Sequence, residues 1–146
     1  MLAKRPDQKV LGYLGRALSL ELSAVQQYST QARLLATWGL SEAAGKFRKE
    51  AEEELQHAER IIERMLAIGA APGSSQLRPV QLAGDLSSLL QANKRFEAEV
   101  ISLYQSAARH CAASGDRDSR VFFEELLQEE QQHHAELDSW LQRLQQ

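Results

Sequence analysis

The 146-residue sequence contains very little cysteine and proline, and it has no long run of apolar residues. Its single cysteine, Cys111, excludes an internal disulfide, a CxxC redox pair and an all-cysteine metal site. The net charge of −3 provides no broad attraction to nucleic acid or to an anionic membrane, so neither is expected as a partner. The apolar runs are too short to span a membrane, and the basic N-terminus lacks the apolar stretch of a secretory signal. We therefore expect a cytoplasmic protein.

The alternating pattern of β-strands is also missing, and the three prolines leave four long segments uninterrupted. In all four segments the apolar residues recur at steps of three and four, which is typical of helices in a left-handed bundle. Gly39 followed by Ser41 predicts the end of one helix and the cap of the next, and Gly115 followed by Asp116 predicts the same farther along. Such short connections favour antiparallel neighbours.

The remaining connection, from Gly69 to Gly84, is longer and contains two of the prolines. Roughly fifteen extended residues at about 3.3 Å each reach about 50 Å, whereas a helix of about 28 residues is about 42 Å long. The connection can therefore run the length of a bundle and return the chain in parallel. We expect one all-α domain over residues 1–146, a four-helix bundle with one long crossover between the second and third helices.

Six acidic and imidazole side chains fall inside the apolar stripes, where a bundle helix normally has only apolar residues. They are Glu21, Glu54, His57, Glu97, Glu130 and His133. Two helices each contribute a Glu-x-x-His step, and each step follows a lone glutamate on the preceding helix by 33 positions. A protein core tolerates four such carboxylates only if positive charge neutralises them. A pair of divalent metal ions is the obvious candidate for that positive charge.

The spacing of these residues favours metal binding over a solvated surface. Residues three apart on a helix share a face, so the glutamate and histidine of each step can bind one ion together. Carboxylate and imidazole ligands suit iron, manganese or zinc. One glutamate from each of two helices plus a Glu-x-x-His from each of the other two is the ligand pattern of di-iron and di-manganese bundles. We expect all six residues to bind two iron ions per chain, with manganese or zinc as alternatives. The alternative is that these carboxylates face solvent. That alternative requires all four glutamates to lie outside the apolar stripes to which the helical period assigns them.

Two tyrosines lie in the same stripes. Tyr28 is two turns beyond Glu21, and its hydroxyl needs a buried partner. It either donates a hydrogen bond to a ligand carboxylate or simply packs in the core, and Tyr104 has the same two interpretations. The glutamates beside the candidate ligands, including Glu53 and Glu129, are expected on a solvated face.

At these positions the chain resembles the bacterioferritin branch of the ferritin family, from about residue 9 to residue 145. The likeness is densest in Glu21–Tyr28, in Trp38–Leu40, in Glu54–Arg60 together with Ile62–Leu66, and in Glu129–His133. The resemblance implies a ferritin-like fold and ferroxidase activity, in which Fe(II) is oxidised by dioxygen or peroxide. It implies iron storage or detoxification if a shell forms.

The resemblance also implies a role for each candidate ligand. The residues that match Glu54 and Glu130 bridge the two irons in that family. One iron is completed by the matches of Glu21 and His57, and the other by the matches of Glu97 and His133.

Three departures from the family pattern are informative. Leu55 stands where the haem-binding methionine follows the bridging glutamate, so haem is not expected. Lys49 falls where some members have a histidine that binds iron on the cavity side. The sequence ends at Gln146, before the short fifth helix of the family. The resemblance therefore does not decide whether a 24-subunit shell forms.

The expected partners are Fe(II), dioxygen or peroxide, and further copies of the chain. Apolar residues outside the stripes predict a homo-oligomer, at least a dimer, and they include Leu20, Leu34, Phe122 and Leu127. The alternative functions are a di-iron or di-manganese oxidase or peroxidase, and a non-catalytic ferritin-like scaffold subunit. Rubrerythrins are disfavoured because they need cysteine pairs. DNA-binding mini-ferritins are disfavoured because their ligands lie across a dimer interface.

Overall fold

The computed structural model describes residues 7–146, and the first six residues, where no secretory signal is expected, lie outside that range. Four helices make up the fold: α1 (Gln8–Thr37), α2 (Ser41–Ala67), α3 (Leu86–Ser114) and α4 (Arg117–Leu144). Residues 7–146 contain no strand, which confirms the all-α prediction. None of these four helices is both long and apolar enough to cross a membrane.

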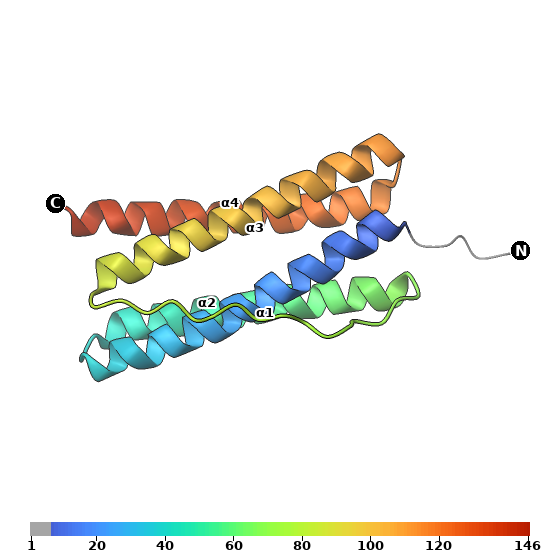
Figure 1. Cartoon of the computed structure of the whole chain (residues 1–146). Coiled ribbons are helices and arrows are strands. Elements are labelled where there is room, and N and C mark those ends of the chain that lie inside the picture. The colour runs from blue at the N-terminus through green and yellow to red at the C-terminus, as the bar shows by residue number, and fades with distance from the viewer. Residues whose placement is uncertain (1–6) are drawn as a thin grey trace, which may run out of the picture.

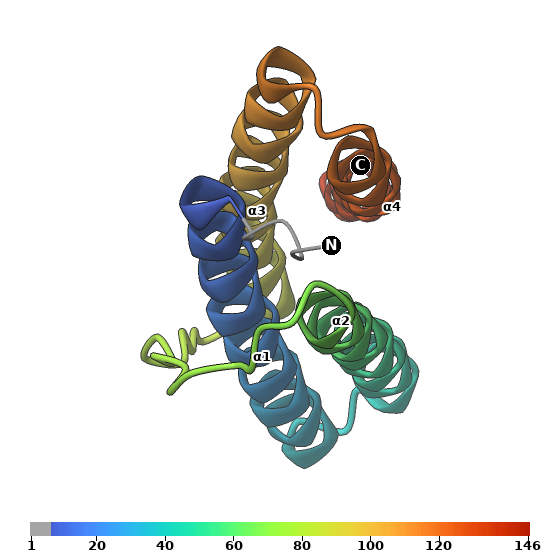
Figure 2. The same ribbon diagram turned by 90° about the vertical axis from the view of Figure 1, so that its right-hand side faces the viewer.

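The helices form two antiparallel pairs joined by the crossover. Figure 1 shows α1 beside α2 and α3 beside α4, with the green loop between α2 and α3 running the whole length of the molecule. The chain thereby returns so that α3 runs parallel to α2, as predicted. In the end-on view of Figure 2, α1 and α3 lie side by side and the crossover passes over the outer side of α1.

The two short connections contain the expected glycines. Gly39 and Gly115 have φ angles of 79° and 77°, a left-handed conformation that glycine adopts without steric cost. Asp116 caps α4 by accepting a hydrogen bond from a backbone N–H three residues ahead. The expected cap at Ser41 is wrong, because Leu40 occupies the N-cap position without a side-chain hydrogen bond and Ser41 is the first helical residue.

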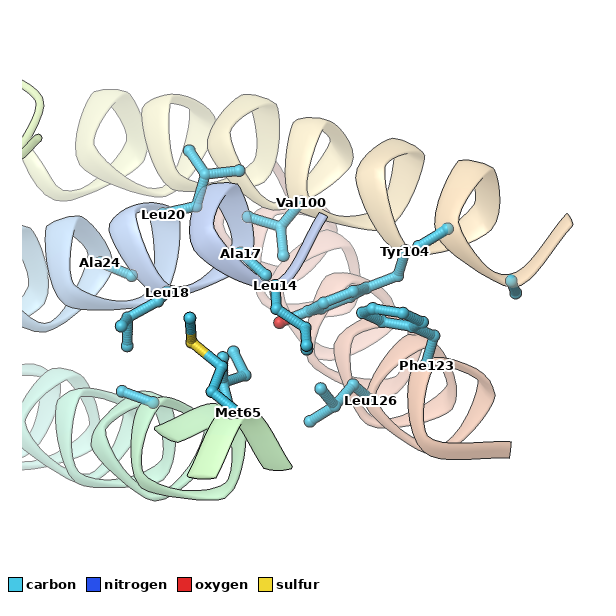
Figure 3. Close-up of a cluster of buried hydrophobic side chains, with 14 of the residues drawn as sticks. Leu14, Ala17, Leu18, Leu20, Ala24, Met65, Val100, Tyr104, Phe123 and Leu126 are labelled. Atoms are coloured by element: carbon cyan, nitrogen blue, oxygen red, sulfur yellow. The ribbon is translucent and has the colours of Figure 1, made fainter. Parts of the chain in front are cut away.

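The apolar core consists of two clusters at opposite ends of the bundle. One contains Leu14, Val100, Tyr104, Phe123 and Leu126 (Figure 3), and the other contains Leu35, Phe47, Leu89 and Leu137. Burying each such large side chain stabilises the fold by about 1.5–3 kcal/mol. On α4 the first cluster ends at Leu126 and the second begins at Leu137, so Glu130 and His133 lie between them. A polar site therefore interrupts the core at mid-length.

A ring of four hydrogen bonds fastens the crossover to the bundle near this site. Gln27 Nε2 donates to Asn93 Oδ1 (2.9 Å), and Asn93 Nδ2 donates to Gln31 Oε1 (2.7 Å). Gln31 Nε2 donates to the carbonyl of Gln81 (2.9 Å), whose own N–H donates to Gln27 Oε1 (3.1 Å). Because every polar group in the ring has a partner, these amides stay buried without the cost of unsatisfied groups.

The apolar residues that were expected to contact another subunit are covered within the chain. Leu20 is buried, and the side chains half-buried against the core are Leu34, Phe122 and Leu127. The exposed large apolar side chains lie elsewhere and include Leu55, Leu66, Leu77 and Leu82. The homo-oligomer stays a prediction, and these exposed leucines replace the predicted residues as its candidate contact surface.

Candidate metal centre

All six predicted site residues converge at the middle of the bundle, and all six are buried. They form two overlapping groups in which the potential ligand atoms lie within 4.8 Å of one another. The first group is Glu21, Glu54, His57 and Glu130, and the second is Glu97, Glu130 and His133. The helices bring together residues up to 112 positions apart in the sequence.

In the first group, the imidazole of His57 points its Nδ1 atom at three carboxylates. This atom lies 2.9 Å from Glu130 Oε1, 3.4 Å from Glu21 Oε2 and 3.7 Å from Glu54 Oε1. Glu21 belongs to α1, Glu54 and His57 to α2, and Glu130 to α4. Three helices therefore supply the carboxylate and imidazole groups of one candidate metal site.

In the second group, His133 takes the place that His57 has in the first. Its Nδ1 lies 3.1 Å from Glu54 Oε1, and Glu97 of α3 completes the group. Glu130 belongs to both groups, and Glu54 lies close to the histidines of both. The two glutamates of the Glu-x-x-His steps thus lie between the two groups.

The tyrosines donate hydrogen bonds to the two lone glutamates, each across the bundle to the other half. Tyr28 donates to Glu97 Oε1 at 2.8 Å, and Tyr104 donates to Glu21 Oε1 at 2.8 Å. Of the two interpretations, hydrogen bonding to a site carboxylate is the one that the structure supports. In both glutamates the second oxygen, Oε2, is buried without a hydrogen-bond partner in the described part of the chain.

Burial and mutual repulsion control protonation at the site. Burial first, and neighbouring carboxylates second, raise the pKa values of Glu21, Glu54 and Glu97. Although burial opposes it, hydrogen bonding to Glu130 and Glu21 raises the pKa of His57 to about 10. Burial also acts against ionisation of Glu130, yet the hydrogen bond to His57 lowers its pKa. In the absence of metal, bound protons therefore neutralise part of the negative charge of these carboxylates.

The donor set fits two divalent cations. Five buried ligand atoms, one from each of five candidate ligands, have no hydrogen-bond partner among residues 7–146: Glu21 Oε2, Glu54 Oε1, Glu97 Oε2, Glu130 Oε2 and His133 Nδ1. Buried polar atoms without partners are costly and rare, so their collection at one point indicates a missing ligand. Four carboxylates and two neutral imidazoles balance the charge of two such ions.

Three further glutamates around the centre were not identified from the sequence. The side chain of Glu53 was expected on a solvated face, but it is 34% exposed and also contacts Nε2 of His133. Glu129 is 49% exposed and lies 3.8 Å from Nε2 of His57. Glu53 and Glu129 each directly precede a glutamate of the site, but the sequence carries no signal that a histidine of the facing helix reaches them.

The third of these residues, Glu50, lies one turn before Glu54 on α2. One of its carboxylate oxygens is buried without a hydrogen-bond partner in the described range. Burial, followed by repulsion from Glu53, Glu136 and Glu130, raises its pKa to about 8. Glu50 therefore extends the negative charge of the centre along α2.

Fold and site together define a four-helix bundle with a carboxylate and histidine dinuclear-type centre between its two halves. A family model described as "Ferritin-like domain" matches residues 11–146. The chain belongs to the ferritin family and, by its relatives, to the bacterioferritin branch. The resemblance inferred from the sequence motifs is thereby confirmed.

Those relatives cover most of the chain. Bacterioferritin of Rhodobacter capsulatus is 36% identical over 127 residues, which are 87% of this chain and 79% of that protein. Bacterioferritin of Brucella melitensis is 33% identical over 138 residues, 94% of this chain and 86% of that protein. The 2.6 Å structure of the R. capsulatus protein, with a metal-free dinuclear site and haem iron, matches with a TM-score of 0.91 and 34% identity. That match covers 95% of this chain and 87% of the R. capsulatus chain.

Proposed function

We propose that this chain is a ferroxidase that binds two Fe(II) ions and oxidises them with dioxygen or peroxide, for iron storage or detoxification. The observation that supports this most strongly is the set of five buried ligand atoms without partners, gathered where four helices meet. Membership of the bacterioferritin branch supports the same conclusion. The two ferrous ions supply the electrons that reduce the oxidant, and Fe(III) is the product.

In this proposal, Glu54 and Glu130 are shared by both ions, because these two carboxylates lie between the groups. The remaining ligands of one ion are Glu21 and His57, and those of the other are Glu97 and His133. Each histidine binds through Nδ1, the nitrogen that faces the carboxylates.

The chain's own groups prepare this centre for a cation. Each tyrosine holds the Oε1 atom of a lone glutamate and leaves Oε2 free to bind metal. Because burial raises the pKa values of Glu21, Glu54 and Glu97, and hydrogen bonding raises that of His57, metal binding displaces protons. Proton release on loading is therefore part of the proposal.

Iron as the metal and the lack of haem are also proposed. Carboxylate-rich sites with two imidazoles suit iron. Leu55 is 42% exposed on α2, and its hydrocarbon side chain has no atom that ligates haem iron. Absorption spectra of the protein expressed with haem supplied are expected to lack a Soret band.

A homo-oligomer of at least two chains is proposed from the outer face of α2. Leu55 and Leu66 are 42% and 60% exposed and lie three helical turns apart, so they share one face. Two exposed leucines of the crossover, Leu77 and Leu82, add apolar surface. Apolar residues that share one exposed helix face form the kind of patch that marks a contact surface. Sedimentation that shows only monomer at micromolar concentration contradicts this part.

Stopped-flow absorbance after mixing anaerobic, Fe(II)-loaded protein with oxygen tests the function. We expect fast oxidation of about two irons per chain, in accord with the ligand count. The double variant Glu54→Ala with Glu130→Ala is expected to lose both the oxidation and the rise in melting temperature that Fe(II) causes by mass action. The matched control is Glu52→Ala with Glu63→Ala, which removes two exposed carboxylates from α2. Metal binding without oxidation indicates the scaffold alternative instead.

A further inference from the structure

Each site histidine has a second carboxylate on its outer side. Nδ1 of His133 faces Glu54, while its Nε2 contacts Oε2 of Glu53. Nδ1 of His57 faces the carboxylates of the site, while its Nε2 lies 3.8 Å from Oε2 of Glu129. In both cases the outer carboxylate belongs to the residue directly before a bridging-position glutamate on the facing helix.

This placement favours one nitrogen of each imidazole for metal binding, through direct contact at His133 and, at 3.8 Å, through charge alone at His57. A neutral imidazole has one N–H donor and one lone pair, on different nitrogens. A carboxylate that accepts from Nε2–H keeps the proton there and leaves the lone pair on Nδ1, toward the centre. Such outer partners fix the ring orientation and raise the basicity of the ligand.

The two outer carboxylates differ in their own partners. Arg60 donates from Nη1 to Oε2 of Glu129 at 2.6 Å, which is the same oxygen that faces His57. Arg60 thereby draws the charge of Glu129 away from the imidazole. Within residues 7–146, Glu53 has no lysine or arginine within ion-pair distance, so no such cation competes with His133 for its carboxylate.

We propose that Glu53 and Glu129 are positioning residues for His133 and His57, and that Glu53 makes the His133 position the tighter of the two divalent-ion sites. This inference rests on the ligand set of the proposed function. It adds an order of filling, with the first ion bound at the His133 end.

Anaerobic titration with Co(II), followed by calorimetry and by visible absorption, tests the proposal. We expect two ions per chain in two resolvable steps for the unmodified protein. Glu53→Ala is expected to weaken the tighter step by about 10–100-fold, and Glu129→Ala to weaken the other step by less. Glu53→Gln, whose amide oxygen still accepts from Nε2–H without a charge, is expected to lie between Glu53→Ala and the unmodified protein. Glu52→Ala, at the adjacent exposed position, is the control.

A second readout does not depend on affinity. In the Zn(II)-loaded protein the Nε2–H proton of His133 gives an NMR signal, whose exchange with water is slowed by an acceptor. Glu53→Ala is expected to speed that exchange, and Glu52→Ala to leave it unchanged.

The outcomes separate the two proposals. If the unmodified protein binds fewer than two Co(II) ions, the ligand set of the proposed function is wrong. If it binds two but Glu53→Ala changes neither affinity beyond the control, the positioning inference is wrong. If Glu129→Ala weakens binding as much as Glu53→Ala, the inferred order of the two sites is wrong.

Discussion

The two halves of the bundle, α1 with α2 and α3 with α4, present the same groups to the centre. A shift of 76 positions relates Glu21 to Glu97. The same shift relates the other members, Glu54 to Glu130, His57 to His133, Tyr28 to Tyr104 and Glu53 to Glu129. The hydrogen bonds repeat as well, because the tyrosine of each half donates to the lone glutamate of the other. The candidate ligands therefore follow an approximate twofold relation.

The halves differ one turn farther from the centre. The counterpart of the partly buried Glu50 in the second half is Leu126, a fully buried core residue. The counterpart of Arg60 is Glu136, which is exposed and adds to the repulsion on Glu50. The His57 end thus has an added positive charge, and the His133 end has added negative charge. The geometry of the candidate ligands is therefore shared between the halves, whereas the charge around them is not.

The largest expected effect tests the shared geometry. Glu54→Ala and Glu130→Ala, made separately, are each expected to abolish tight binding of both ions, because each removes a carboxylate that lies between the two groups. At a metal concentration of 100 times Kd, each bound ion gives the unmodified protein about 2.7 kcal/mol of stability, which neither variant gains. Anaerobic Fe(II) titration and thermal melting measure this. Loss of only one ion in either variant contradicts a shared ligand.

Removing the two tyrosine hydroxyls tests the twofold relation at the next level. Tyr28→Phe and Tyr104→Phe each remove one buried hydrogen bond to a carboxylate, so each is expected to lower the metal-free stability by about 1.5–3 kcal/mol. Denaturant unfolding measures the two losses, with Tyr13→Phe as a control for ring packing against Phe123. Unequal losses indicate that the halves already differ at the ligands.

Glu50 tests the difference between the halves through pH. Its folded pKa of about 8 exceeds the ordinary value near 4.5, so between these values the folded state binds more protons than the unfolded state. The metal-free protein therefore loses stability as pH rises from about 4.5 to about 8. Glu50→Gln removes this loss, and its stabilising effect is expected to grow from pH 5 to pH 8, reaching about 1–2 kcal/mol.

The control for this prediction is Glu52→Gln, which removes a charge from an exposed position on the same helix. Denaturant unfolding at pH 5 and pH 8 gives the comparison. A Glu50→Gln variant that is no more stable than the Glu52→Gln control at pH 8 shows that Glu50 is not strained by burial.

The fold and the six candidate ligands were predictable because both depend on a helical period. Acidic residues inside an apolar stripe stand out when the stripe is read at steps of three and four. The crossover was predictable from its length alone. The N-cap at Leu40 was not, because Ser41 is a preferred capping residue one position away.

The outer carboxylates escaped sequence reasoning for a physical reason. Glu53 and Glu129 directly precede stripe residues, and adjacent residues on a helix point about 100° apart. On their own helices these glutamates face outward. Their contacts arise because the histidine of the facing helix extends its ring toward them, which depends on how two helices pack. The buried amide ring was hidden for a similar reason, because it depends on the path of the crossover around Gln81.

The smallest expected effect concerns Arg60, the residue that distinguishes the His57 end. Its ion pair with Glu129 is partly exposed to solvent, which screens the charges, so Arg60→Gln is expected to change stability by no more than about 1 kcal/mol. Once the arginine is removed, the full charge of Glu129 acts on Nε2 of His57. Co(II) affinity at the weaker position is therefore expected to rise about threefold, which corresponds to roughly 0.6 kcal/mol. The two steps of the titration move closer together and the halves become more alike. A fall in affinity at that position instead shows that Arg60 holds Glu129 in place for His57, rather than competing with it.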